Sequence, residues 1–424
     1  MKRKHQSWFI FVLCLLLTLN LVINYQTNSL KHQDLASARQ SPPSTEIRGV
    51  WLTNVASGIL FFPWGINRAV YQLSQLNFNT IYPVVWNRGH TFYPSKVAKS
   101  VTGEKQDPFL NTIRLGGDVL AEIIQEGNLQ GLRIIPWFEY GFMAPPNSQL
   151  VKNHPNWLTK NSSLCVNSAK NKLKKQDKLS PECTTHKSVE GDAPENGSSK
   201  QVWLNPLHPE VQKLILNLIV EVVKNYDVDG IQLDDHFGMP VELGYDYFTV
   251  KLYQKEHEGK LPPNNPLVSE WMRWRANKIS KFMEQIYKKV KSIKPDCLIS
   301  LSPNSQSFSY NNYLQDWETW VQRGWIDELV LQAYRNDMSS FEAELMKPAV
   351  QKARQKIPVS IGITTGTGIR PVGMKRIKAQ VEAVRDRGFD GVSFFYWETL
   401  WSYMTPESPK QRRQGFRELF GERG

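Results

Sequence analysis

The stretch Tyr226-Asp-Val-Asp-Gly-Ile-Gln-Leu-Asp-Asp-His236 carries the strongest indication of the fold. A short apolar run, Ile231–Leu233, leads directly into acidic residues. An amphipathic helical pattern, Val211–Tyr226, precedes this run, and another, Glu270–Lys291, follows it. A short buried strand between two amphipathic helices is the repeating unit of a parallel sheet covered by helices.

The same unit recurs along the chain, and this repetition predicts the architecture. Short strand-like runs occur at Ile47–Asn54, Thr80–Asn87, Arg133–Tyr140, Gly230–Asp235, Leu298–Ser302, Glu328–Tyr334, Val359–Thr364 and Gly391–Glu398. Further helical patterns occur at Ile66–Leu76, Asp118–Asn128, Phe341–Gln355 and Met374–Arg387. Eight such repeats predict an α/β fold of the closed (β/α)8 TIM-barrel type over residues 46–424. The alternative, an open doubly wound sheet, needs a glycine-rich turn after its first strand, and Trp51-Leu-Thr-Asn54 offers none.

Two long connections are expected at the end of the barrel that carries function. Residues 88–113 follow the second strand and residues 141–208 follow the third. Both leave the carboxyl ends of strands, where barrels place their active sites. Long loops there are expected to form the walls of a cleft. Within the second connection, residues of about 145–200 form a polar insert rich in Lys, Ser and Asn.

The first 45 residues differ in composition from the barrel. Lys2, Arg3 and Lys4 precede an apolar run from Trp8 to Ile23. A basic start followed by an apolar run is typical of a signal-anchor or a signal peptide, here residues 1–23. Residues 24–45 are polar and are interpreted as a flexible linker. We therefore expect a protein exported to the cell envelope, anchored to the inner membrane, or secreted if the segment is cleaved.

Charge and cysteine content narrow the possible partners. The formal net charge of +12 is spread along the chain, and its only dense basic runs are Lys2-Arg3-Lys4 and Lys170–Lys178. No known nucleic-acid-binding module is recognised, so no nucleic-acid partner is expected. Diffuse positive charge suits an anionic surface such as a membrane or cell wall. Cys165 and Cys183 in the polar insert are a disulfide candidate in an oxidising compartment, and Cys297 is expected to be a buried apolar residue. The oligomeric state is left open.

Polar side chains at the expected strand ends define a candidate site. Side chains alternate along a strand, so Ile231 and Leu233 should face the helices while Gln232 and Asp234 point into the barrel. Asp235 then falls at the rim, its side chain diverging from that of Asp234. The expected substrate-binding residues are Trp86, Asn87, Trp137, His236, Asn304, Gln332, Tyr334, Trp397 and Glu398. The tryptophans are included because an aromatic face can stack on a sugar ring.

The acidic residues point to hydrolysis of glycosidic bonds. That reaction generally uses two carboxyl groups, one that protonates the leaving oxygen and one that acts as nucleophile or base. Asp234, Asp235 and Glu139 are the expected catalytic residues, with Asp234 at the reacting carbon. Glu398 is a weaker alternative to Glu139. A glutamate beside Trp137 could have its pKa raised by desolvation, as an acid requires. No cofactor or metal is expected.

Several segments together resemble the glycosyl hydrolase-like 10 family. They are Glu46-Ile-Arg-Gly-Val-Trp-Leu-Thr-Asn54, Trp203-Leu-Asn-Pro206, His208-Pro-Glu210, Tyr226–Asp235, Ser302-Pro303 and Gln332-Ala-Tyr334. The resemblance implies a barrel glycosidase of the cell envelope, with some members acting on peptidoglycan glycan strands, and it extends most securely to Asp234 and Asp235. Many members carry a Trp-x-Asn-Pro-like element at the end of strand three, where this chain has Trp137-Phe-Glu139-Tyr140.

Two other functions are compatible with these residues. One is a carbohydrate-binding barrel without catalysis. The other is a metal-dependent polysaccharide deacetylase that uses Asp234, Asp235 and His236. No His-x-x-x-His pair occurs among the eight histidines, and consecutive strand residues are expected to diverge rather than converge on a metal.

Overall fold

The computed structural model describes residues 46–62, 64–162, 201–367, 370–401 and 405–421. The expected signal segment and linker, most of the polar insert, and both Cys165 and Cys183 lie outside the described residues. Among the described residues, no helix is both long enough and apolar enough to cross a membrane.

Eight parallel strand positions close into a barrel, as the sequence predicts. Its strands are β1 (Ile47–Leu52), β2 (Thr80–Asn87), β4 (Arg133–Ile134) with β5 (Trp137–Phe138), β8 (Gly230–Asp234), β9 (Leu298–Ser302), β10 (Glu328–Gln332), β11 (Val359–Thr364) and β14 (Gly391–Phe395). Each pairs with its neighbours in chain order, and β1 closes the ring by pairing with both β14 and β2.

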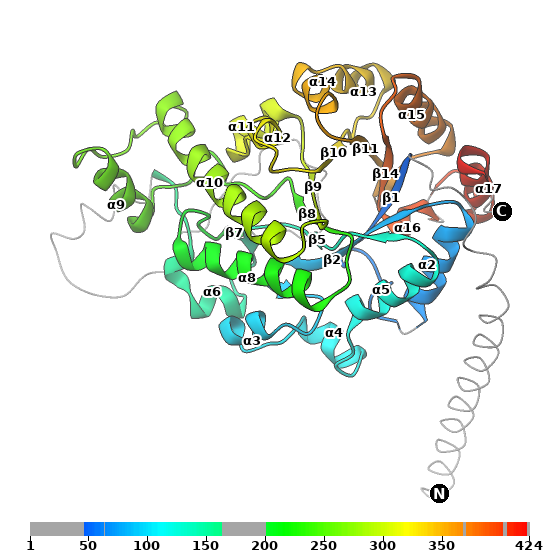
Figure 1. Cartoon of the computed structure of the whole chain (residues 1–424), viewed down its shortest axis with the longest axis horizontal. Coiled ribbons are helices and arrows are strands. Elements are labelled where there is room, and N and C mark those ends of the chain that lie inside the picture. The colour runs from blue at the N-terminus through cyan, green and yellow to red at the C-terminus, as the bar shows by residue number, and fades with distance from the viewer. Residues whose placement is uncertain (1–45, 63, 163–200, 368–369, 402–404, 422–424) are drawn as a thin grey trace, which may run out of the picture.

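Amphipathic helices surround the barrel (Figure 1). The principal ones are α2 (Gly65–Gln75), α5 (Val119–Leu129), α8 (Pro209–Asn225), α10 (Ser269–Ile293), α12 (Trp317–Gln322), α14 (Pro348–Arg354), α15 (Met374–Asp386) and α17 (Pro409–Phe420). Each buries one apolar stripe against the strands. In α8, for example, the buried residues recur at the helical spacing from Val211 to Val223.

The barrel interior follows the expected alternation of side chains. Gln232 accepts a hydrogen bond from Nε1 of Trp51 (2.7 Å) and donates one to Oγ of Ser300 (3.0 Å). These two hydrogen bonds connect side chains of β1, β8 and β9 inside the lumen. Ser300 donates in turn to Glu328 (3.1 Å), which also pairs with Arg133. Polar side chains therefore face inward on β8, β9 and β10, while Ile231 and Leu233 are buried on the opposite side of their strand.

Proline accounts for two departures from the expected elements. The helix expected at Phe341–Gln355 is two helices, α13 (Met338–Leu345) and α14, because Pro348 lacks the N–H that a continuous helix needs and occupies the first turn of α14. The third strand is interrupted at Pro136, which separates β4 from β5.

Cys297 is fully buried with a free thiol, as expected.

The loops at the carboxyl ends of the strands carry additional elements. The connection after β2 contains β3 (His90–Thr91), α3 (Lys96–Thr102) and α4 (Pro108–Ile113). The described part of the connection after β5 contains β6 (Met143–Ala144), α6 (Gln149–Asn153) and β7 (Val202–Trp203). A third long connection, which the sequence pattern did not indicate, follows β8 and contains α9 (Tyr247–Glu256); α11 (Gln306–Tyr313) follows β9.

Candidate active site

Asp234 is the last residue of β8, and protein donors hold both of its carboxylate oxygens. Oδ1 accepts a hydrogen bond from the backbone N–H of Asp235 (2.7 Å) and a longer one from Nε2 of Gln332 (3.4 Å). Oδ2 accepts one from the backbone N–H of Tyr140 (2.9 Å) and lies 3.4 Å from Nδ1 of His236. Only 3% of Asp234 is exposed. Asp234 is therefore fixed in place and connects the ends of strands three and four.

Asp235 and His236 form a contact that the sequence did not predict. Nδ1 of His236 lies 2.8 Å from Oδ1 of Asp235, while Oδ2 of Asp235 accepts a hydrogen bond from Nδ2 of Asn304 (2.7 Å). The expectation that the side chains of Asp234 and Asp235 diverge is wrong. The alternation of side chains between the two faces of the strand ends at Asp234, the last residue of β8. A tight turn follows, in which the N–H of Phe237 donates to the carbonyl of Asp234 (3.0 Å), and it directs the side chains of Asp235 and His236 back toward Asp234.

Burial and mutual contact move the pKa values of the two aspartates in opposite directions. Burial and the negative charge of Asp234 raise the pKa of Asp235 to about 8. Burial also disfavours ionised Asp234, but hydrogen bonds from His236, Asp235 and Tyr140 outweigh it and lower its pKa. Burial acts against imidazolium as well, yet the neighbouring carboxylates raise the pKa of His236 well above its usual value. Of the adjacent pair, Asp235 is therefore the carboxyl whose pKa is raised, so a proton taken up by the pair is held more tightly on Asp235 than on Asp234.

Glu139 projects from the end of β5 toward strands one and two. Its Oε2 accepts hydrogen bonds from Oγ1 of Thr53 (2.8 Å) and Nδ2 of Asn87 (3.0 Å). The register pairs Trp137 with Gln232 and Phe138 with Leu233, so Glu139 continues level with Asp234. Like Asp234, it has the parity that points into the barrel mouth.

The phenol of Tyr334 lies close enough to Asp234, Asp235 and Glu139 for the charge of each to affect its pKa. Burial raises the pKa of its phenol well above the usual value, and the charges of Asp235, Asp234 and Glu139 raise it further. Its ring stacks on Phe395 at 5.6 Å between centroids. The structure therefore brings Asp234, Asp235, Glu139 and Tyr334 to one mouth, at the carboxyl ends of strands three, four and six.

The expected substrate-binding residues separate into distinct environments. Asn304 and His236 contact Asp235, Gln332 contacts Asp234, and Asn87 contacts Glu139. Trp137 packs against Trp51 and Phe395, and its buried Nε1 has no hydrogen-bond partner among the described residues.

The remaining three expected substrate-binding residues lie in other surroundings. Trp86 is only 1% exposed and donates to the carbonyl of Gly141, so the structure places it in the core rather than on an accessible wall. Trp397 and Glu398 line a separate pocket, because β14 ends at Phe395 and both residues belong to the short helix α16 (Trp397–Leu400).

Sequence reasoning missed several residues that shape the mouth. Trp203 and Tyr313 both pack against the His236 ring, with centroid distances of 6.0 and 5.7 Å, and Trp203 also stacks on Tyr313. Thr53 donates to Glu139. Trp203 belongs to the Trp-Leu-Asn-Pro segment of the family resemblance, which could have pointed to it; Tyr313 lies in no such segment.

The cluster also provides donors that suit a metal ion. Asp234, Asp235 and His236 each offer one ligand atom, and these atoms lie within 4.8 Å of one another. Two carboxylates and an imidazole suit a transition metal such as zinc or iron. The convergence overturns the geometric argument that consecutive residues could not share a metal. In this arrangement, however, Nδ1 of His236 is already directed at the carboxylates.

The closed parallel barrel and its acidic strand ends define a barrel hydrolase. The model of the glycosyl hydrolase-like 10 family matches residues 46–183 and 164–384, and the chain belongs to that family of glycosidases. It is 24% identical over 341 residues to "Glycosyl hydrolase DigH" of Escherichia coli K12, covering 70% of this chain and 69% of that one. It is 23% identical over 322 residues to "Glycosyl hydrolase YngK" of Bacillus subtilis, covering 68% of this chain and 54% of that one.

Solved structures share the fold at low sequence identity. The glycoside hydrolase domain of PgaB (BpsB) from Bordetella bronchiseptica superposes with a TM-score of 0.59 at 14% identity, over 88% of this chain and 99% of that one. The catalytic domain of a Paenibacillus polymyxa β-amylase gives 0.55 at 11% identity, over 90% of this chain and 99% of that one. These two comparisons show that the chain shares the barrel fold of both structures.

Proposed function

We propose that this glycosidase cleaves glycan strands of the cell envelope, with peptidoglycan as its substrate, and that Asp235 is its general acid. The observation that carries the assignment is the buried contact of Asp235 with His236 and Asn304 beside Asp234 at the end of β8. There, burial and the charge of Asp234 raise the pKa of Asp235, while hydrogen bonds lower that of Asp234, as expected of an acid and its ionised neighbour. A pKa near 8 keeps Asp235 protonated at neutral pH, ready to protonate the leaving glycosidic oxygen.

Glu139 is proposed as the second carboxyl group of the reaction. It projects toward strands one and two, whereas Asp235 is held toward strand five by Asn304. The two carboxyl groups are thus held by different neighbouring strands, and a glycosidase needs two carboxyl groups mounted on opposite sides of the bond that it cleaves. This revises the expectation that Asp234 attacks the reacting carbon.

Asp234 is proposed as a positioning residue. Its oxygens are occupied by donors from Tyr140, Asp235, His236 and Gln332, so it fixes the geometry of the mouth. Its negative charge also keeps the proton on Asp235, since ionising both neighbours would bring two buried charges together.

The choice of peptidoglycan is supported by three features. The family resemblance includes proteins that act on its glycan strands. The diffuse net charge of +12 favours approach to an anionic wall. The basic and apolar start of the chain is typical of proteins exported to the envelope, and we propose that this protein is exported and tethered there.

The proposal is tested by incubating the purified full chain with peptidoglycan sacculi and, separately, with neutral glucans. Released fragments are identified by mass spectrometry. We expect new reducing ends from peptidoglycan only, and their absence from the Asp235→Asn and Glu139→Gln variants. Binding of sacculi without any reducing ends in the wild type would instead identify a non-catalytic carbohydrate-binding barrel.

The convergence of Asp234, Asp235 and His236 favours one alternative, a metal-dependent deacetylase. Such an enzyme would release acetate rather than reducing ends, and a chelator would abolish its activity. Measuring both products with and without chelator separates the two functions.

A further inference from the structure

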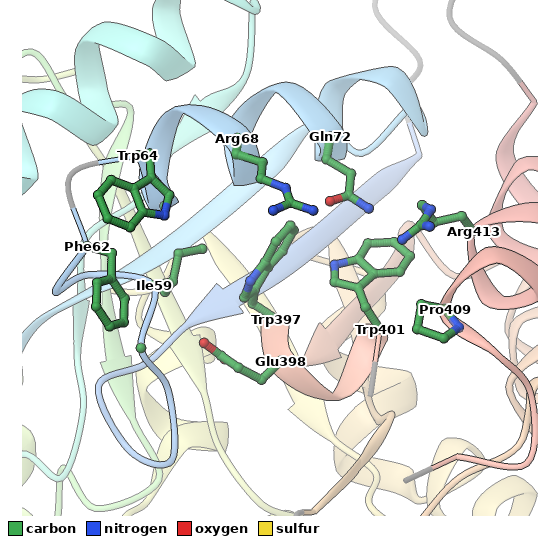
Figure 2. Close-up of a pocket in the computed structure, with 12 residues that line it drawn as sticks. Ile59, Phe62, Trp64, Arg68, Gln72, Trp397, Glu398, Trp401, Pro409 and Arg413 are labelled. Carbon is green, nitrogen blue, oxygen red and sulfur yellow. The ribbon is translucent and has the colours of Figure 1, made fainter. Parts of the chain in front are cut away.

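A pocket lies on the rim of the barrel, and its lining does not include Asp234, Asp235 or Glu139. It has a volume of about 360 Å³ and lies between the loop after β1, the start of α2, the helix α16 and the start of α17 (Figure 2). The loop after β1 and α16 both follow carboxyl ends of strands, so the pocket opens on the same face of the barrel as the mouth. Ser57 on that loop donates a hydrogen bond to Glu398, which holds the two sides together.

Two positive charges in this pocket have no partner. Arg68 on α2 and Arg413 on α17 both line it, and neither side chain forms an ion pair or hydrogen bond within the described residues. Most other lining residues are apolar or aromatic. Two unpaired guanidinium groups over one pocket favour an anionic ligand, and a carboxylate fits their planar array of donors.

Two residues that line the pocket each contain a buried polar atom without a hydrogen-bond partner among the described residues. Nε1 of Trp401 and Oε2 of Glu398 are buried without a hydrogen bond among the described residues. A buried polar atom without a partner costs free energy unless a ligand or water satisfies it. Burial raises the pKa of Glu398 to about 7, although Ser57 and backbone amides of residues 58 and 59 favour its ionised form.

Aromatic side chains form an exposed wall at the opening. Trp64 is 66% exposed and Phe62 is 51% exposed, and their rings stack at 5.9 Å between centroids. Inside, Trp397 meets Trp401 edge to face at 5.7 Å. Exposed aromatic faces beside hydrogen-bonding groups are suited to the mixed apolar and hydroxylated surface of a sugar ring.

We propose that this rim pocket is a second glycan-binding site that holds a carboxylate-bearing sugar unit. Arg68 and Arg413 bind the carboxylate, and Trp64 and Phe62 contact the sugar ring. The site rests on the proposed function, because the sugar belongs to the same glycan chain that is cut in the mouth. The pocket would hold an acidic sugar of the glycan chain while a glycosidic bond further along the same glycan lies at Asp235.

Binding of defined oligosaccharides to the full chain tests the site. The Asp235→Asn variant is titrated by calorimetry with oligosaccharides of alternating N-acetylglucosamine and N-acetylmuramic acid, and with neutral N-acetylglucosamine oligomers of equal length. We expect the acidic oligomer to bind at least about tenfold more tightly, and adding Arg68→Gln with Arg413→Gln to abolish that difference. Arg323→Gln, which changes an exposed arginine elsewhere, is the matched control. Inorganic phosphate is titrated as a third ligand.

The possible outcomes separate this site from the proposed function. Equal affinities for acidic and neutral oligomers would overturn the proposed binding site. A preference for the acidic oligomer that persists when both Arg68 and Arg413 are replaced would overturn it as well. Phosphate binding as strong as that of the acidic oligomer would also overturn it, because the site would then recognise an anion and not a sugar. Trp64→Ala should weaken binding of the acidic oligomer without altering the melting temperature. Hydrolysis is measured separately on the wild type, so that failed catalysis with intact pocket binding contradicts only the proposed function.

Discussion

His236 bridges two adjacent carboxylates, with Nδ1 lying 2.8 Å from Oδ1 of Asp235 and 3.4 Å from Oδ2 of Asp234. One ring thereby joins a carboxyl whose pKa is raised to one whose pKa is lowered. Trp203 and Tyr313 pack around the ring and limit its rotation. Of the two carboxyl groups, Asp235 is the one that holds a proton to higher pH.

Replacing Asp235 by Asn should lower kcat/KM by about 10²–10⁴, the usual contribution of a general acid. The fold should persist, because the new amide oxygen can still accept the hydrogen bond of Asn304. Initial rates on peptidoglycan fragments measure the effect, with melting curves to confirm folding. Asp296→Asn, an exposed change elsewhere, is the control and should retain full activity. Near-normal turnover by Asp235→Asn would refute the acid assignment.

The pH profile of kcat/KM should fall on the alkaline side with an apparent pKa near 8. Asp235 has its pKa raised to about 8, so it is protonated and active below that pH and loses its proton above it. Rates with one soluble substrate across pH 5–10 provide the test. A profile that is flat between about pH 7 and pH 10 would contradict the assignment.

Asp234→Asn should move that alkaline limb to lower pH. Removing the negative charge beside Asp235 removes one cause of its raised pKa, so Asp235 should lose its proton earlier. Activity at pH 6 should fall less than activity at pH 8. If Asp234 were the nucleophile, both rates would instead collapse equally by several orders of magnitude, and the positioning role would be wrong.

Glu139→Gln should lower kcat by at least about 10² while leaving the fold intact. The amide oxygen of Gln can still accept hydrogen bonds from Thr53 and Asn87. If Glu139 is a nucleophile, added azide should restore part of the activity of Glu139→Ala by replacing the lost carboxylate. Unchanged kcat in Glu139→Gln would remove Glu139 from the reaction.

Arg275→Met should destabilise the loop after β8 by about 2–4 kcal/mol. The side chain is fully buried and donates to the carbonyl oxygens of Val241, Leu243 and Pro266, which would lose their partner. Urea unfolding and limited proteolysis measure the loss. The exposed change Arg323→Met should leave the free energy of unfolding nearly unaltered, and an equal loss in both variants would contradict this role.

The sequence by itself determined the barrel and the location of its functional end. Apolar runs alternating with amphipathic helices defined all eight strand positions, because a strand buried on both faces needs continuous apolar residues. Side-chain parity also placed Gln232 and Asp234 correctly in the lumen. These features depend on the local periodicity of apolar residues, which can be identified from the sequence alone.

Only the tertiary structure decided how the strand-end residues meet. Alternation applies within a strand, and it stops at Asp234, where a turn brings Asp235 and His236 back onto the same side. Likewise, β14 ends at Phe395, so Glu398 belongs to the short helix α16 and lines the rim pocket. The pKa difference between Asp234 and Asp235 arises from burial and from contacts with residues on other loops, which no local pattern in the sequence encodes.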